Sequence, residues 1–237
     1  MDAVKPRFSI CIPVWEQGGF GIQYLKELLN SITIQSFKDF EIIISDHSKD
    51  DVIKHFVLGV LWNDYFPAMT YKRYVENYGN GVANLNNALK MANGEVIKIM
   101  FQDDFMFDRR CLEKFDKAFQ DETGWAVCGC NHTRDGVNFE RFMIPSWNDK
   151  LLEGVNTISS PSVLAFRNEN IELFDENLTM LMDVEYYYRL GERYGLPTIL
   201  EDCLVTNRCH PNQISSRYNG NLEEEIRYCK EKYAKRN

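Results

Sequence analysis

The chain has 237 residues, of which 44% are hydrophobic, a length and composition that allow one sizeable core and favour a single domain. Its 35 acidic and 27 basic residues give a formal net charge of -8 at pH 7, which argues against nucleic acid as a partner. No apolar run approaches the roughly 20 residues of a membrane span, and the first ten residues lack the apolar core of a secretion signal, so we expect a cytoplasmic protein without a transmembrane segment.

The first half of the sequence alternates short apolar runs with segments of helical periodicity. The apolar run at 8–13 ends in a proline, which is typical of a buried strand, and the apolar residues of 22–35 recur every three or four positions, as on one face of a helix. We expect strands at 8–13, 41–45, 70–75 and 96–101, and helices at 22–35, 53–61 and 81–92. Strands and helices in alternation predict a parallel sheet covered by helices, an α/β fold.

The second half, from about residue 109, is less regular. We expect a short helix near 112–119, strands at 125–130, 162–167 and 198–205, a polar connection at 131–156 and a helix near 183–193. Such a region favours a second substrate site over another nucleotide-binding half. Glutamates just after residue 221 and basic residues toward 236 complement a helix dipole, which predicts a terminal helix at about 221–236.

Polar residues follow three of the expected strands at the point where each strand ends. They are the segment from Pro13 to Glu16, the pair Ser45 and Asp46, and the segment from Gln102 to Asp104. Ligands of an open parallel sheet bind outside the carboxyl ends of its strands. We therefore expect these residues, although far apart in the sequence, at one edge of one sheet.

The adjacent carboxylates Asp103 and Asp104 repel each other unless a cation, a hydrogen-bond donor or water intervenes. A hard divalent cation, Mn²⁺ or Mg²⁺, takes oxygen ligands from one or two carboxylates together with substrate phosphates. Because neighbouring side chains of an extended backbone point in opposite directions, we expect one aspartate on the metal and the other on the ribose or a backbone donor. Which aspartate binds the metal stays open, and the plainer alternative is a solvated turn that caps the following helix.

Five segments of the sequence, in order, resemble one known family. They are FSICIPVWEQ, LLNSITIQSFKDFEIIISD, GVANLNNALKMANGEVIKIMFQDD, LMDVEYYYRL and NRCHPNQISS. From residue 8 to about 216 the series is similar to the inverting family 2 glycosyltransferases of the GT-A fold. The resemblance implies a single α/β domain over 1–237 with a GT-A (Rossmann-like) fold and a mostly parallel central sheet, the donor site in about 8–108 and the acceptor site in about 109–216.

The resemblance also implies roles for the matching residues. The base pocket is expected at Pro13, Val14 and Glu16, a hydrogen bond to the base or ribose at Asp46, and further nucleotide contacts at Asn86 and Asp103. The metal, Mn²⁺ or Mg²⁺ across the diphosphate, is expected at Asp103 or Asp104, with His210 on the metal or the diphosphate. Asp183 is expected to be the catalytic base.

The implied reaction moves a sugar from a nucleoside-diphosphate sugar, with UDP the favoured nucleotide, to a hydroxyl of a carbohydrate or another acceptor in glycan or polysaccharide synthesis. A bound cation stabilises the charge that develops on the leaving diphosphate. Asp183 deprotonates the attacking hydroxyl on the opposite face of the sugar, which inverts the anomeric centre. The glutamate that usually precedes the base in this family is Met182 here, so Glu185 remains a rival base.

Two other functions compete with sugar transfer. A sugar nucleotidyltransferase is disfavoured because no glycine-rich, lysine-bearing phosphate loop lies near the first strand. An inactive module that binds nucleotide sugar or carbohydrate is disfavoured because the acidic residues and His210 are all retained. The glycine, asparagine and serine content of 211–220, next to His210, predicts a mobile lid over the donor.

Overall fold

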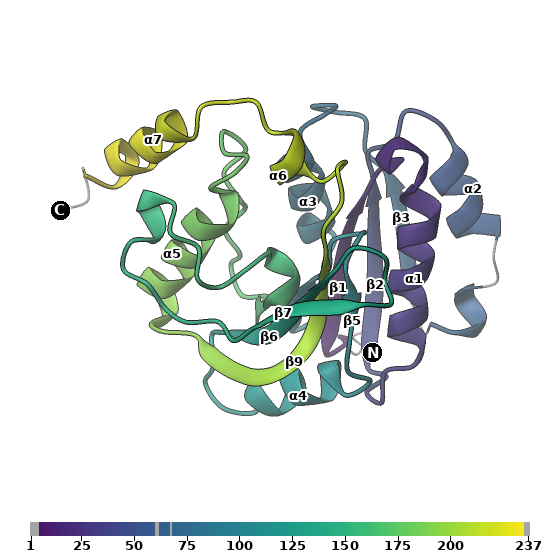
Figure 1. Cartoon of the computed structure of the whole chain (residues 1–237). Helices are drawn as coiled ribbons and strands as arrows, with labels where there is room; N and C mark the ends of the chain where they lie inside the picture. The colour runs from purple at the N-terminus through teal and green to yellow at the C-terminus, as the bar shows by residue number, and fades with distance from the viewer. Residues whose placement is uncertain (1–4, 60–61, 67, 235–237) are drawn as a thin grey trace.

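The computed structural model of the chain describes residues 5–59, 62–66 and 68–234 (Figure 1). Within these residues a nine-stranded sheet runs through the molecule in the order β3-β2-β1-β4-β8-β6-β9-β5, with β7 paired to β6. Its strands are β1 (Phe8–Val14), β2 (Phe40–Asp46), β3 (Met69–Arg73), β4 (Val96–Ile99), β5 (Phe105–Met106), β6 (Trp125–Thr133), β7 (Phe139–Met143), β8 (Leu164–Arg167) and β9 (Thr198–Arg208).

The first four strands are all parallel to one another. They are connected by helices α1 (Gly21–Thr33), α2 (Val52–Gly59) and α3 (Gly81–Lys90). The chain steps from β1 to β2 to β3 in one direction and returns past β1 to β4, so right-handed crossovers place α1 and α2 on one face of the sheet and α3 on the other, as Figure 1 shows. The strands and helices expected for this half are confirmed, except that residues 60 and 61 of the expected helix at 53–61 lie outside the described residues.

The second half adds antiparallel strands to the same sheet. β8 is antiparallel to both β4 and β6, and β5 and β7 are antiparallel to β9 and β6, while β6 and β9 are parallel. Helices α4 (Cys111–Ala118) and α5 (Met182–Tyr194) complete this half. The α/β fold with one central sheet is confirmed. Among the described residues, its parallel pairing is concentrated in the first four strands and in the β6–β9 pair.

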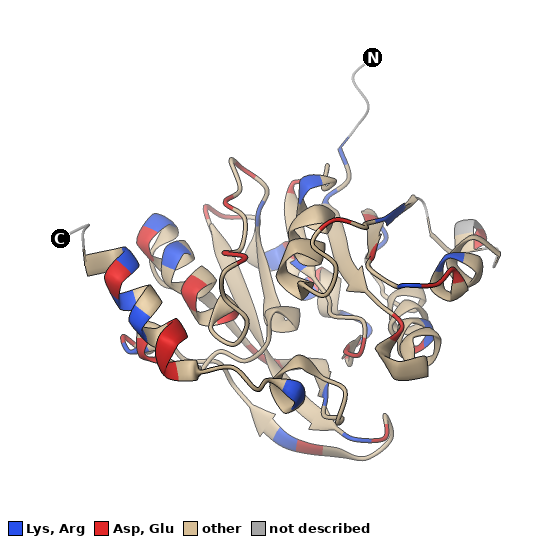
Figure 2. Cartoon of the chain, turned by 90° about the horizontal axis from the view of Figure 1, so that it is seen from above, with Lys and Arg blue, Asp and Glu red and all other residues tan. Residues whose placement is uncertain are grey.

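The C-terminal part consists of a short helix, α6 (Ile214–Arg217), and a longer one, α7 (Leu222–Ala234). Figure 2 shows acidic residues in the first turn of α7 and basic residues further along it, as the sequence pattern predicts. The observed bounds agree with the expected terminal helix, whose positions 235 and 236 lie outside the described residues. In the part of the chain that is described, no helix has the length and apolar character needed to cross a bilayer.

The core contains one buried charge that the sequence does not explain. Lys98 of β4 is completely buried, and its Nζ donates to the carbonyl oxygens of Ile99, Ser162 and Leu164. Burial lowers the pKa of this ammonium group. Through these hydrogen bonds Lys98 links the end of β4 to the beginning of β8 and to the segment before it, next to the acidic pair.

Candidate active site

The carboxyl ends of the first strands meet at one edge of the sheet. Val14, the last residue of β1, is in register with Asp46, the last residue of β2. The acidic segment after β4 joins them because the backbone N–H of Trp15 donates to Oε1 of Gln102 at 2.9 Å. The structure therefore brings together the three polar segments that the sequence analysis singled out.

Asp46 lies at this edge but is completely buried. One carboxylate oxygen accepts from the backbone N–H and hydroxyl of Ser48, at 2.9 and 2.5 Å. The other accepts from the hydroxyl of Tyr71 at 2.6 Å and lies 3.5 Å from Nη1 of Arg73. Both oxygens are thus engaged by protein groups, so a nucleotide reaches Asp46 only by replacing one of these partners.

The residues expected to form the base pocket differ in accessibility. The side chain of Val14 is completely buried, whereas Pro13 and Glu16 are partly exposed. The carboxylate of Glu16 accepts from the backbone N–H of Lys49 and from the hydroxyl of Tyr78, both at 3.3 Å. Glu16 is therefore accessible at the rim of the site, whereas the side chain of Val14 packs inside the fold.

Three rings at this rim were not predicted from the sequence. The ring centroid of His47 lies 5.4 Å from that of Tyr74 and 5.1 Å from that of Tyr78. Burial lowers the pKa of His47, which favours the neutral imidazole. The ammonium of Lys49 lies 5.0 Å from the centroid of the Tyr78 ring. Together these side chains offer aromatic surface next to Glu16, the kind of surface against which a base stacks.

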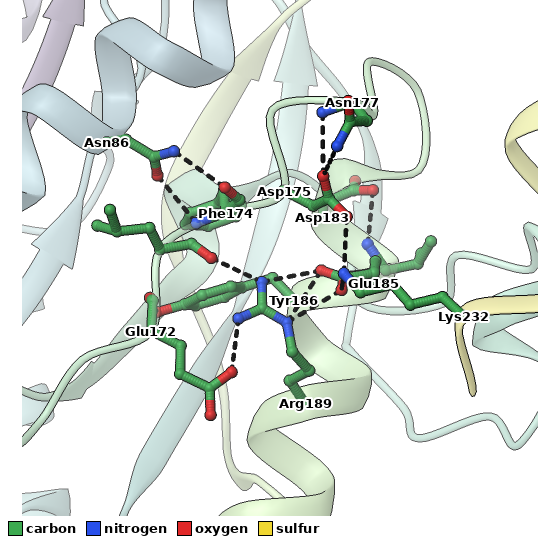
Figure 3. A network of polar contacts seen from close by, with 12 residues as sticks. Asn86, Glu172, Phe174, Asp175, Asn177, Asp183, Glu185, Tyr186, Arg189 and Lys232 are labelled. Carbon is green, nitrogen blue, oxygen red and sulfur yellow. Dashed lines mark hydrogen bonds and ion pairs between the residues drawn. The ribbon is translucent and has the colours of Figure 1, made fainter. Parts of the chain in front are cut away.

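Asn86 is buried, and its side chain is bonded to protein groups. It pairs with the backbone of Phe174, donating to the carbonyl at 2.9 Å and accepting from the N–H at 2.9 Å (Figure 3). It also donates to Glu176. Two other asparagines of α3 touch the strand ends: Asn84 donates to the carbonyl of Val14 and accepts from the hydroxyl of Ser45, and Asn87 donates to the same hydroxyl oxygen. Asn86 therefore joins α3 to the segment that leads into α5.

The two aspartates of the acidic pair point in different directions. Oδ2 of Asp103 lies 2.8 Å from Nε2 of His210. Asp104 is buried, and its Oδ1 accepts from the backbone N–H of Arg208 at 2.9 Å. Burial, reinforced by the charge of Asp103, raises the pKa of Asp104 to about 8. One aspartate thus faces a histidine at the rim, and the other faces a backbone donor inside the fold.

Arg208 holds the acidic turn in place, a role that the sequence analysis did not foresee. Its Nε donates to the carbonyl oxygen of Asp103 at 3.0 Å. The guanidinium is paired with Glu27 of α1 and lies 4.8 Å from the centroid of the Tyr24 ring. The turn is therefore braced from α1 by a cation that is almost fully buried.

The described residues contain no group of three or more His, Cys, Asp or Glu side chains arranged to hold a metal. Asp103 and His210 nevertheless offer one oxygen and one nitrogen side by side. The backbone N–H of Asn212 donates to Nδ1 of His210 at 3.2 Å, so the neutral ring carries its proton on Nε2, facing Asp103. A cation held by Asp103 and His210 would take the place of that proton. Two protein ligands leave room for phosphate oxygens and water, which suits Mn²⁺ or Mg²⁺.

A cavity of about 750 Å³ opens beside His210. It is lined by residues at the start of α1, of the β6–β7 loop and of the segment after β9, among them Phe20, Tyr24, Arg134, Asn212 and Ser216. The expected lid contributes to one wall of it. Within the lid, the guanidinium of Arg217 lies 5.6 Å from the centroid of the Trp15 ring, so α6 contacts the end of β1.

Asp183 lies in the first turn of α5 and is partly exposed. Its carboxylate accepts from the backbone N–H of Val184 and from Nδ2 of Asn156, each at 2.7 Å. Burial raises the pKa of Asp183 to about 7, against the opposing effect of these hydrogen bonds. A carboxyl group with such a pKa exchanges protons readily near neutral pH, as a general base requires.

Glu185, the rival base, is in a different environment. It is completely buried and paired with Arg189 at 2.9 Å and with Lys232 at 2.7 Å (Figure 3). It also accepts from the hydroxyl of Tyr233 at 2.5 Å. These partners tie α5 to α7. All the acceptor capacity of Glu185 is directed at protein donors, which marks it as part of the structural framework.

A short segment of the chain, residues 156–160, connects the acidic pair with Asp183. The hydroxyl of Ser160 donates to Oδ1 of Asn207 at 2.9 Å and lies 3.5 Å from Oδ2 of Asp104. At the other end Asn156 contacts Asp183. Ser159, between them, has a φ of 99°, a conformation that is costly for a residue with a side chain. The segment therefore links Asp104 of the acidic pair to Asp183 and contains a strained residue between the two contacts.

Comparison with known proteins supports the class that this fold and site define. The model of glycosyl transferase family 2 matches residues 9–177, more than half of the chain. The protein therefore belongs to glycosyl transferase family 2 and has the GT-A fold of that family.

Among its relatives, an uncharacterized glycosyltransferase of Rickettsia typhi is 26% identical, over 94% of this chain and 70% of its own length. The GalNAc(5)-diNAcBac-PP-undecaprenol beta-1,3-glucosyltransferase of Campylobacter jejuni is 33% identical, but over 48% of this chain and 35% of its own length. The chain thus spans about a third of that enzyme.

Two solved structures share the fold at low sequence identity. S. aureus TarS 1–349 in complex with UDP-GlcNAc superimposes with a TM-score of 0.70, at 18% identity, over 94% of this chain and 65% of that one. The mannosyltransferase PcManGT of Pyrobaculum calidifontis, in complex with GDP-Man and Mn²⁺, gives a TM-score of 0.62 at 18% identity, over 86% of this chain and 57% of that one.

Proposed function

We propose that this glycosyltransferase is a metal-dependent, inverting enzyme that moves a sugar from a nucleoside-diphosphate sugar to an acceptor hydroxyl. The observation that carries the proposal is the contact between Asp103 and His210 at the edge of the sheet where the first strands end. It places an oxygen and a nitrogen ligand where diphosphates bind in folds of this kind. Asp183, across the 156–160 segment, supplies a separate carboxylate for proton transfer.

Asp103 and His210 are the proposed metal ligands, and Asp104 is assigned to holding the turn. The cation, Mn²⁺ or Mg²⁺, supplies charge stabilisation for the leaving diphosphate. Asp104 is less suited to the metal because it is buried and bonded to the backbone of Arg208. Arg208 in turn fixes the backbone of Asp103 through its carbonyl oxygen, so the ligand is oriented before the donor binds.

Asp183 is the proposed base. Its position at the beginning of α5 leaves it partly exposed, and a pKa of about 7 allows it to take a proton from an acceptor hydroxyl at neutral pH. Attack by that hydroxyl from the face opposite the leaving group inverts the anomeric centre. The complete burial of Glu185 and its ion pairs with Arg189 and Lys232 support Asp183 over Glu185 in this role.

For the donor we favour a UDP-sugar, with a role in glycan or polysaccharide synthesis in the cytoplasm. The relatives support a nucleotide-sugar donor, since TarS was solved with UDP-GlcNAc and PcManGT with GDP-Man. The aromatic rim formed by His47, Tyr74 and Tyr78 is the proposed platform for the base.

A thermal-shift panel tests the donor and the metal together. UDP, GDP and dTDP are each added with and without Mn²⁺, and the unfolding midpoint is recorded. Binding to the folded state alone raises the midpoint in proportion to affinity. We expect a rise with UDP that is larger in the presence of Mn²⁺. No rise with any of the three nucleotides, at millimolar concentrations with Mn²⁺, contradicts the proposed donor class.

A further inference from the structure

Two residues outside α5 act on Asp183. Asn156, in the connection that ends at residue 160, contacts its carboxylate, and Glu225 of the C-terminal helix α7 binds the backbone just before α5. Neither relationship is apparent from the sequence, because Asn156 and Glu225 lie 27 positions before and 42 positions after Asp183. Both bear on where the carboxylate points and on whether it is ionised.

Asn156 acts on the carboxylate directly. Its Nδ2 donates to Oδ2 of Asp183 at 2.7 Å and to the carbonyl of Ser159 at 3.2 Å. Its Oδ1 accepts from the backbone N–H groups of Ile158 and Ser159 at 3.0 and 2.9 Å, which fixes the orientation of the amide. The amide therefore presents a preset N–H donor, and a donor stabilises the ionised form of a carboxylate.

Glu225 of α7 acts through the backbone before α5. Its carboxylate accepts from three successive N–H groups, those of Thr179, Met180 and Leu181, at 3.2, 2.9 and 2.9 Å for Oε2. These residues lead directly into the first turn of α5, where Asp183 lies. The negative charge of Glu225 is also felt by Asp183, and a neighbouring like charge stabilises the protonated form.

We propose that Asn156 and Glu225 are positioning residues for Asp183 that bias its ionisation in opposite directions, Asn156 toward the carboxylate and Glu225 toward the acid. The inference rests on the proposed role of Asp183 as the base. Burial is the main cause of the raised pKa of Asp183, and the two residues adjust the ionisation that burial sets. The carboxyl group can then accept a proton during transfer and release it afterwards. In this way α7, which lies outside the region matched by the family, contributes to the active site.

The other polar groups around Asp183 do not provide either effect. Tyr187, on the same helix, is buried and donates its hydroxyl hydrogen to the carbonyl of Ser159. Glu185 faces Arg189 and Lys232 on the far side of α5. Tyr218 donates to Oε1 of Glu225 at 2.8 Å, so it reaches Asp183 only through that carboxylate.

The test is a direct titration of Asp183 in the full-length protein by NMR of ¹³C-labelled aspartate carboxyl groups. The signal of Asp183 is identified by its loss in Asp183→Asn. Asn156→Ala removes the donor and should move the titration midpoint to higher pH, by about half a pH unit or more. Glu225→Gln removes the charge but keeps an acceptor for the backbone N–H groups, and should move the midpoint to lower pH by a similar amount.

The control is Glu223→Gln, an exposed residue two positions before Glu225 with the same loss of charge. It should leave the midpoint unchanged, and an equal shift in this variant would attribute the effect to net charge and overturn the proposal. Midpoints that stay at the wild-type value in both Asn156→Ala and Glu225→Gln overturn it as well. Should Glu225→Gln fail to fold, Asn156→Ala decides alone, because Asn156 is exposed in a loop.

The same variants separate this inference from the proposed function. If Asp183→Asn retains turnover of a UDP-sugar, the assignment of the base fails, whatever the titrations give. If Asp183→Asn abolishes turnover but neither Asn156→Ala nor Glu225→Gln changes the titration midpoint of Asp183, the base assignment stands and the positioning roles fail. When both hold, the acid limb of the rate profile shifts in the direction of the NMR midpoint in each variant.

Discussion

Oδ2 of Asp103 lies 2.8 Å from Nε2 of His210, although the two residues are 107 positions apart in the sequence. Asp103 follows β4 near the middle of the sheet, and His210 follows β9 two strands beyond β8. The contact exists because β5, which directly follows the acidic pair, pairs with the last part of β9, and because Arg208 binds the backbone of Asp103. It is the geometric basis of the proposed metal site.

The first prediction concerns these ligands. Asp103→Ala and His210→Ala should each remove most of the extra thermal stabilisation that Mn²⁺ adds to UDP binding, because each variant deletes one of two protein ligands. The measurement is the unfolding midpoint with UDP, with and without Mn²⁺. Asp64→Ala, which changes an exposed aspartate of the short 3-10 helix Trp62–Asp64, is the control. A full Mn²⁺ effect in both ligand variants rules out this site.

The second prediction concerns Asp183. Asp183→Asn should bind the donor nucleotide as the wild type does, while turnover falls by about 10²- to 10⁴-fold, the usual contribution of a general base. Turnover is measured with the UDP-sugar selected by the thermal-shift panel, and binding by the midpoint itself. Normal turnover in this variant requires another base. Lost nucleotide binding instead places Asp183 in the donor site.

The third prediction assigns Glu185 to stability. Glu185→Gln removes the completely buried carboxylate that Arg189 and Lys232 share and leaves each cation with one other partner, Glu172 or Asp175. The free energy of unfolding should therefore fall, by at most about 3–5 kcal/mol, the usual cost of breaking a buried ion pair. Urea unfolding measures the change. Turnover per folded molecule at 20 °C should stay within a few-fold of wild type. A collapse of turnover with unchanged stability makes Glu185 the base after all.

The fourth prediction is the pH dependence of the reaction. The base must be ionised to accept a proton, and burial raises the pKa of Asp183 to about 7. Activity should therefore be low at pH 5.5, rise through pH 7 and level off above it, with a slope of about tenfold per pH unit on the acid side. The stability effect has the opposite sign: the unfolded chain ionises this group near its ordinary pKa, so its contribution to stability falls as the pH rises toward 7.

Much of the fold follows from local patterns. The apolar runs at 8–13, 41–45 and 96–101 become β1, β2 and β4, and the helical periodicity of 22–35 becomes α1, with ends that differ by two residues at most. These predictions succeed because the periodicity of burial differs between strands and helices. The pairing of β8 between β4 and β6 was not predicted, because strand order depends on contacts between distant residues that leave no local signal.

The candidate site, like the fold, could be predicted from the sequence only in part. Pro13, Asp46 and Asp103 are found at one sheet edge because parallel strands align their carboxyl ends, a rule that needs only the strand positions. Val14 and Asn86 illustrate the limit of that rule. The side chain of Val14 is buried, and the side chain of Asn86 is buried and hydrogen-bonded to Phe174. The direction of a side chain at the end of an element depends on its neighbours in space.

The sequence by itself determined the alternation of strands and helices, the segment that carries the acidic pair and the resemblance to a family, because each of these resides in the order and spacing of residues along the chain. Only the tertiary structure decided that Asp103 contacts His210 and that Glu185 pairs with Arg189 and Lys232. It also decided that Asn156 contacts Asp183 and that Glu225 binds the backbone just before α5. Hydrogen bonds and ion pairs act over about 3–4 Å, so their partners are set by how the chain packs in space rather than by separation along it.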